Sequence, residues 1–210
     1  MKLPKELLHK LDANGEPVKK VKILPGEYYA SSEDVIITTL LGSCVAACLY
    51  DPVHKVIGMN HFLLSNDRYS REMPACKSEA GRYGVYAMEM LVNDMLKRGA
   101  SRRNMQAKAF GGATQLNINS SRGNDVFTCV GEVNCRFVRE YLSRENIPLV
   151  VEDLGGAQGR VVHFCFSDFT IFSRKIEKTF TASLVKRDKA FWKKSVEKQQ
   201  NAVSDNDIWL

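Results

Sequence analysis

The sequence contains no long hydrophobic run. Its longest apolar stretches, such as residues 45–50 and 62–64, are much shorter than the roughly 20 residues that a membrane-spanning helix needs. Residues 1–17 carry charges throughout and lack the apolar core of a secretory signal. We therefore expect a cytoplasmic protein that is not inserted in a membrane.

The sequence also lacks any pair of cysteines at C-x-x-C spacing, which argues against a structural zinc site. A chain of 210 residues does not need disulfides to be stable, and the cytosol keeps thiols reduced. Most of its six cysteines are expected to be small buried hydrophobic residues. They are Cys44, Cys48, Cys76, Cys129, Cys135 and Cys165.

The central part of the chain has no excess of positive charge, although the net charge is +6. Lys and Arg outnumber Asp and Glu by six to three in residues 1–25 and by nine to five in residues 174–210. A basic stripe on the folded domain is typical of nucleic-acid binding, so we expect no nucleic-acid partner. Basic ends are usually solvated, although they can also assist docking on an acidic protein surface.

The chain divides into three parts by composition. They are a basic N-terminal extension (1–25), a central domain (26–178) and a charged C-terminal tail (179–210). Apolar residues at helical spacing predict helices over 79–98 and 134–146, and a short helix is expected over 5–11. Strands are predicted over 35–38, 45–50, 56–61, 106–110, 149–152, 161–166 and 170–173. This order lacks a βαβ rhythm and favours an α+β layered fold.

A thiol and an imidazole are brought together by a predicted hairpin. If residues 51–55 form its loop, Tyr50 pairs with Val56 and His61 faces Val45, next to Cys44. A bulge or a slip of one residue decides which side chains meet. The hairpin places Cys44 and His61 at the same end of one sheet in either case.

Such a pair has a clear chemical use. An imidazole lowers the pKa of a neighbouring thiol and accepts its proton, which makes the sulfur nucleophilic. Gly42 and Ser43 permit a tight turn before Cys44, and backbone N–H groups there can stabilise an oxyanion. A third group must orient the imidazole, and Thr38 at the end of the preceding strand is a candidate.

Other readings of the same residues stay open at this point. A lone Cys or His beside apolar residues is more often a core residue than a catalytic one. A metal site formed by Cys44, His61 and Cys165 is a further alternative, although these residues lack zinc-finger spacing.

Two glycine pairs are further candidates for the site. Residues 111–112 predict a tight turn after a strand or the border of a groove. Residues 155–156, with Asp153 and Arg160, predict a turn with an ion pair or a substrate-binding edge.

Several motifs together resemble the CheD family of chemoreceptor glutamine deamidases. The resemblance spans roughly residues 25–175, with motifs in matching order and spacing. They are LGSCVA (41–46), GMNHF (58–62), RYG (82–84), AME (87–89), AFGGA (109–113), VGEVN (130–134) and EDLGG (152–156) with Arg160.

The resemblance implies a fold, an activity and a set of site residues. It places the family's nucleophile on Cys44, its histidine on His61 and its threonine on Thr38, with no metal and no cofactor. It implies a layered β-sandwich of mixed sheets flanked by helices, similar to the catalytic domain of the cytotoxic necrotizing factor toxins, within a deamidase domain over 26–178. The implied substrates are glutamines of methyl-accepting chemotaxis receptors. The alternative is a regulatory module that binds the phosphatase CheC, with catalysis secondary.

Overall fold

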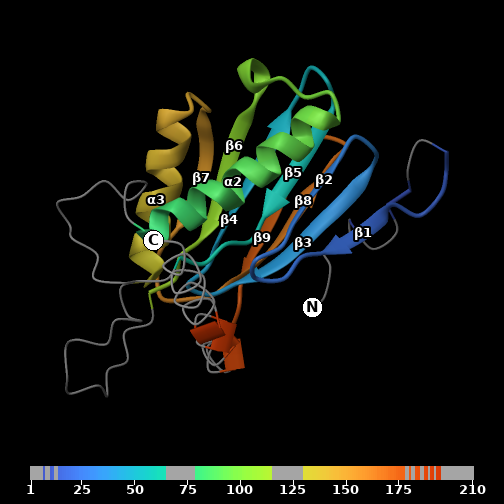
Figure 1. Cartoon of the computed structure of the whole chain (residues 1–210). Helices are drawn as coiled ribbons and strands as arrows, with labels where there is room; N and C mark the ends of the chain where they lie inside the picture. The colour runs from blue at the N-terminus through green and yellow to red at the C-terminus, as the bar shows by residue number, and fades with distance from the viewer. Residues whose placement is uncertain are drawn as a thin grey trace, which may run out of the picture.

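The computed structural model describes most of the central part of the chain and several residues toward each end (Figure 1). The described residues are 7, 10–11, 14–64, 79–114, 130–177, 180, 183–184, 187–188, 190–191 and 193–194. Cys76, Cys129 and most of the helix expected over 5–11 lie outside them.

The larger sheet in the described part of the chain has five strands in the order β2-β5-β4-β6-β7. Its members are β2 (Tyr28–Ser31), β4 (Val45–Asp51), β5 (Val56–Asn60), β6 (Gln106–Gly111) and β7 (Leu149–Leu154). Neighbouring strands are antiparallel except for β6 and β7, which are parallel.

The smaller sheet has four strands in the order β1-β3-β8-β9. They are β1 (Lys19–Lys22), β3 (Val35–Leu41), β8 (Arg160–Cys165) and β9 (Ile171–Lys175). β1 and β3 are parallel, whereas β8 is antiparallel to both of its neighbours. Both sheets are therefore mixed.

Helices α2 (Glu79–Lys97) and α3 (Val130–Arg144) cover one face of the five-stranded sheet (Figure 1). A short 3₁₀ turn, η2 (Arg102–Asn104), follows α2. One apolar cluster fills the space between these helices and the sheet, and a second lies between the two sheets. The central strand β4 is buried along its whole length, because it is covered on both faces.

The α+β class and its mixed sheets confirm the fold expected from the sequence order. The seven predicted strands correspond to β3 through β9, and the two long helices correspond to α2 and α3. The strands β1 and β2 were not predicted. α3 begins at Val130, four residues before the predicted start at residue 134.

Residues before the predicted boundary at residue 26 contribute to the folded core. β1 lies in this stretch and pairs with β3 from Lys19↔Val35 to Lys22↔Thr38. Val18 and Ile23, on either side of β1, are buried. Among the described residues, no helix is both long enough and apolar enough to cross a membrane.

The packing of α2 on β5 leaves no room for a side chain at Gly58. A Cβ at this position would lie 2.6 Å from Leu91 Cδ1 and 2.9 Å from Met95 Sδ. We predict that Gly58→Val lowers the free energy of unfolding by about 1–3 kcal/mol, through overpacking. Urea unfolding measures this change.

The control for that experiment is Val53→Ala in the β4–β5 loop, where the side chain is 68% exposed. It should change the free energy of unfolding by less than about 0.5 kcal/mol. An unfolding midpoint of Gly58→Val equal to that of the unmodified protein would show that α2 does not pack as described.

Candidate active site

Residues 42–44 form the connection between the two sheets. β3 ends at Leu41 in the four-stranded sheet, and β4 begins at Val45 in the five-stranded sheet. Cys44 therefore lies where the chain passes from one layer to the other.

The backbone of this connection is fixed by its surroundings. Each of its three carbonyl groups accepts a hydrogen bond of 2.7–2.8 Å from outside the connection. The pairs are Ala113 N with Gly42 O, Asn134 Nδ2 with Ser43 O, and Gly112 N with Cys44 O. Because these carbonyls are held, the position of the Cys44 backbone is defined.

The glycine pair at residues 111–112, at the end of β6, packs directly against this connection. Both residues have positive φ, 113° at Gly111 and 67° at Gly112, a conformation that glycine adopts without steric cost. A Cβ at Gly111 would lie 2.2 Å from Cys44 O. Gly111 is the last residue of β6 and Gly112 follows it without forming a tight turn, so the turn expected at this pair is not found.

The pairing of β4 with β5 differs by one residue from the predicted register. Tyr50 pairs with Ile57, not with Val56, because Asp51 extends the ladder. The Asp51 carboxylate accepts hydrogen bonds from the N–H groups of Val53 and His54, so the loop is residues 52–55.

This shift puts the thiol and the imidazole on the same face of the sheet. Val45 bridges to Phe62, so the same register places Ala46 opposite His61. Directly opposed residues share a face, and Cys44 is two residues from Ala46. Cys44 and His61 are therefore diagonal neighbours, a relationship in which Cα atoms lie about 7–8 Å apart. The cluster between the two sheets includes Cys44 and excludes Val45.

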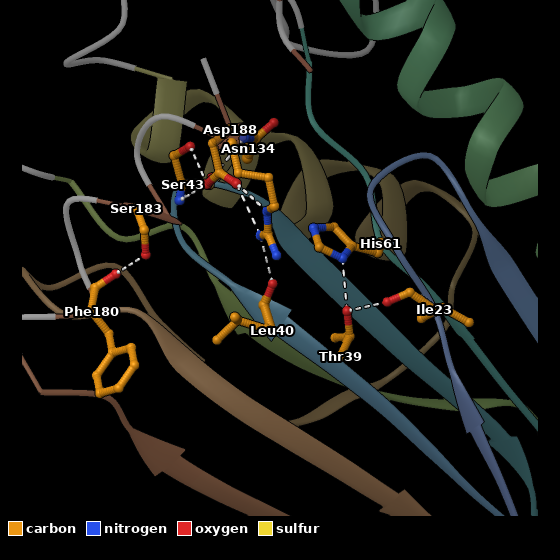
Figure 2. A network of polar contacts seen from close by, with 10 residues as sticks. Ile23, Thr39, Leu40, Ser43, His61, Asn134, Phe180, Ser183 and Asp188 are labelled. Atoms are coloured by element: carbon orange, nitrogen blue, oxygen red, sulfur yellow. Dashed lines mark hydrogen bonds and ion pairs between the residues drawn. The ribbon is translucent and has the colours of Figure 1, made fainter. Parts of the chain in front are cut away.

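The hydroxyl of Thr39 fixes the orientation of the His61 ring. Thr39 Oγ1 lies 2.7 Å from His61 Nδ1 and donates a hydrogen bond of 2.9 Å to the carbonyl of Ile23 (Figure 2). A hydroxyl has one hydrogen, and the carbonyl can only accept. The oxygen must then accept from Nδ1–H of the neutral ring, which leaves Nε2 unprotonated. The ring is held in the tautomer that a general base requires.

Thr38, the residue expected to orient His61, does not contact it. Its hydroxyl lies 2.9 Å from His163 Nδ1, on the face of the four-stranded sheet that points away from the other sheet. Alternate residues of a strand point to opposite faces, and it is Thr39 that points inward. The hydrogen-bond partner of the His61 ring is therefore Thr39, the residue after Thr38 in β3.

Both members of the Cys–His pair are buried. The exposed fraction is 0% for Cys44 and 1% for His61. Burial and the nearby charge of Arg187 lower the pKa of His61 to about 3. Burial, followed by the carboxylate of Asp188, raises the pKa of the Cys44 thiol well above its ordinary value. His61 Nε2 has no hydrogen-bond partner among the described residues.

A segment near the C-terminal end of the sequence covers this pair. We call the described helical residues 180, 183–184, 187–188, 190–191 and 193–194 the covering segment. Asp188 Oδ2 accepts hydrogen bonds from Ser43 N at 3.1 Å and Ser43 Oγ at 3.2 Å (Figure 2). A cavity of about 170 Å³ next to His61 is lined in part by Phe191. These residues belong to the charged tail expected from the sequence, and their contact with the site was not predicted.

The remaining candidates lie outside this arrangement. Arg160 pairs with Asp153 at 2.8 Å and donates to the carbonyls of Asp153 and Gly155, which confirms the ion pair, and the chain bends at residues 156–158. Cys165 belongs to a different apolar cluster from Cys44, so the structure does not bring the proposed metal ligands together. Cys48 is buried, as expected.

The fold and the site define a class: a two-sheet α+β protein with a buried cysteine and an oriented histidine at the crossing between the sheets. The family model described as CheD chemotactic sensory transduction matches residues 63–175, more than half of the chain. The chain belongs to the CheD family.

Relatives with known names support this membership. A Geobacter sulfurreducens protein named "Probable chemoreceptor glutamine deamidase CheD 1" is 50% identical over 190 residues, which are 90% of this chain and 94% of the relative. A Shewanella oneidensis protein named "Probable chemoreceptor glutamine deamidase CheD 2" is 49% identical over 157 residues, 75% of this chain and 77% of the relative.

A comparison with solved structures gives a more distant likeness. A Neisseria meningitidis crystal structure assigned to the family model DUF152 matches with a TM-score of 0.37 and 13% identity. The match covers 69% of this chain and 64% of that one. It carries no argument about fold or function.

The buried, neutral state of His61 makes stability depend on pH. An unfolded histidine has a pKa of about 6.5, so between that value and about 3 the unfolded chain binds a proton that the folded chain does not. Stability should fall as the pH is lowered through this window, with a contribution from His61 of up to about 1.4 kcal/mol per pH unit.

We predict that His61→Gln reduces the pH dependence of the free energy of unfolding in this window by up to about 1.4 kcal/mol per pH unit. Urea unfolding at a series of pH values measures it. His163, whose pKa burial and Arg174 lower to about 4, contributes equally to both proteins and cancels in the difference. Parallel curves for the two proteins would mean that His61 is not buried in the neutral form.

Proposed function

We propose that this chain is a cytoplasmic cysteine hydrolase that converts glutamine side chains of methyl-accepting chemotaxis receptors to glutamate and ammonia. The observation that carries the proposal is the orientation of His61. Thr39 holds the ring with Nε2 unprotonated, on the same sheet face as Cys44. The names of the relatives supply the substrate class.

The first step is attack by the cysteine. His61 Nε2 takes the proton of the Cys44 thiol, and the sulfur forms a bond to the carbon of the substrate carboxamide. The carbonyl π electrons move to the oxygen, and a tetrahedral oxyanion results. Thr39 stabilises the protonated ring in place, because its oxygen still accepts from Nδ1–H.

The N–H of Ser43 is a donor for that oxyanion. It already binds a carboxylate oxygen, Asp188 Oδ2, at 3.1 Å, so it points into the space beside Cys44. A preorganised donor of this kind typically contributes about 3 kcal/mol to stabilising the transition state. The absence of a side chain at Gly42 leaves this space open, since a Cβ there would lie 2.4 Å from Asp188 Oδ2.

The imidazolium then returns its proton to the departing nitrogen, and ammonia leaves a thioester on Cys44. His61 removes a proton from water as the water attacks the thioester carbon. The carbon–sulfur bond breaks, the proton returns to sulfur, and glutamate is released. Every step uses groups of this chain, the substrate and water.

The proposal extends to the bounds of the catalytic domain, its fold and its partners. We assign the catalytic domain to residues 26–178. Strand β1, in the extension before it, pairs with β3 of this domain. We include a likeness to the catalytic domain of the cytotoxic necrotizing factors, on the basis of the family resemblance. CheC is retained as a candidate second partner in this proposal, and the alternative function is a regulatory module that binds CheC, with catalysis secondary.

We predict that Cys44→Ala abolishes ammonia release from receptor fragments, with a loss of at least about a thousandfold, because the nucleophile is gone. Mass spectrometry of co-expressed receptors should show amide-to-acid conversion at particular glutamines with the unmodified protein only. Equal conversion by both proteins would contradict the proposal. CheC binding by Cys44→Ala, combined with a normal chemotaxis phenotype, would favour the regulatory alternative.

Neighbouring threonines provide a matched pair of variants. We predict that Thr39→Val lowers kcat about tenfold with little change in KM, because one hydrogen bond that orients the ring is lost. Thr38→Val removes the same group from the opposite face and should keep the kcat of the unmodified protein. A kcat loss confined to Thr38→Val would assign the positioning role to Thr38 instead.

A further inference from the structure

Asp188 occupies the part of the site where the proposed reaction forms its oxyanion. We propose that the covering segment is an intramolecular inhibitor, in which the Asp188 carboxylate takes the place of the product carboxylate and keeps substrate out. This inference rests on the proposed function, because it identifies the Ser43 N–H as the group for which substrate and Asp188 compete.

The contacts of Asp188 are those expected of a bound carboxylate product. Its exposed fraction is 1%, and one oxygen accepts from both the N–H and the hydroxyl of Ser43. The space it fills depends on the absence of a side chain at Gly42. A substrate oxygen cannot bind the Ser43 N–H while Asp188 Oδ2 lies 3.1 Å from it.

Arg187 anchors this carboxylate to the end of β3. Its Nη2 lies 3.0 Å from Asp188 Oδ1 and donates to the carbonyl of Leu40 at 2.9 Å. The guanidinium compensates the charge of the buried carboxylate, which reduces the cost of placing that charge in the site. Arg187 and Asp188 therefore enter the site together as an ion pair without net charge.

Two apolar residues hold the covering segment on the protein. Leu184 is buried in a cluster with Val161 and Ile176. Phe191 lines the cavity next to His61 and packs against the core between the two sheets. These contacts lie on both sides of Asp188 along the chain.

The same segment has features that permit it to leave. Phe180 is 66% exposed, and a cavity of about 700 Å³ lies between the segment and the four-stranded sheet, lined by Ser183 and Arg187 on one side and Lys22 and Arg174 on the other. Few buried contacts favour local opening over global unfolding. Opening is required for activity, because Cys44 is fully buried in the closed form.

The closed form also suppresses the chemistry of the cysteine. A carboxylate beside a thiol disfavours the thiolate, since two negative charges would lie close together. The Asp188 charge raises the pKa of the Cys44 thiol, in addition to the larger effect of burial. Removal of Asp188 therefore both opens the site and favours the reactive form of the sulfur.

The test measures the rate at which iodoacetamide alkylates Cys44 in the full-length chain, by mass spectrometry of the Cys44 peptide. Asp188→Ala should increase this rate by about tenfold or more, the effect of losing hydrogen bonds to a charged group. The control is Ser183→Ala in the same segment, whose hydroxyl donates to the carbonyl of Phe180 within that segment. It should keep the rate of the unmodified protein.

Cys48 is an internal reference, because it is equally buried but lies deeper in β4. Its alkylation rate should not change in Asp188→Ala. Equal Cys44 rates in Asp188→Ala and the unmodified protein would overturn the proposal, and so would a parallel rise at Cys48, which indicates general loosening. If Asp188→Ala does not fold, Asp188→Asn serves in its place, since it keeps the size and removes the charge.

Measuring receptor deamidation distinguishes a failure of the inhibitor proposal from a failure of the proposed deamidase function. Substrate binds only the open form, so Asp188→Ala should lower KM and leave kcat nearly unchanged. A fall in kcat in the folded variant would overturn the inhibitor role, because Asp188 would then assist catalysis. Faster alkylation of Cys44 without deamidation in any variant would support closure by the segment and contradict the deamidase function.

Discussion

The hydrogen bond from the Thr39 hydroxyl to the Ile23 carbonyl is a small interaction on which the candidate chemistry depends. Because that hydroxyl has no second hydrogen to give, the His61 ring must present Nδ1–H to it and keep Nε2 as a lone-pair nitrogen. The three groups come from three places: the residue after β1, strand β3 of the same sheet, and the end of β5 in the other sheet. The site exists only when both sheets are packed together.

The layered fold accounts for the position of the cysteine. Residues 42–44 pass between sheets, and their carbonyls accept hydrogen bonds from the N–H groups of Gly112 and Ala113 after β6 and from Asn134 of α3. The Ser43 N–H is thereby directed toward the covering segment, where it meets Asp188. Cys44, His61 and the Ser43 N–H are thus placed by backbone and side-chain hydrogen bonds that link both sheets and α3.

The sequence predicted strands β3 to β9, the long helices and the placement of Cys44 and His61 at one end of a hairpin, because apolar periodicity and hairpin length are local signals. It missed the register because Asp51, a typical loop residue, joins the ladder while its carboxylate binds the turn. It indicated Thr38 instead of Thr39 because β3 has apolar residues on both of its faces. The alternation of residue types therefore does not reveal which threonine faces the other sheet. The covering segment was missed because a run of four charged residues at 186–189 interrupts its apolar residues, so Leu184 and Phe191, seven positions apart, do not stand out as one apolar face.

The central claim is that His61 holds its proton on Nδ1 and keeps Nε2 unprotonated. Long-range proton–nitrogen NMR correlation of the histidine side chains in the folded protein at neutral pH measures this directly, since protonated and unprotonated ring nitrogens have well-separated shifts. The account predicts a protonated Nδ1 and an unprotonated Nε2 for His61. A signal from the opposite tautomer, with the proton on Nε2, would contradict it.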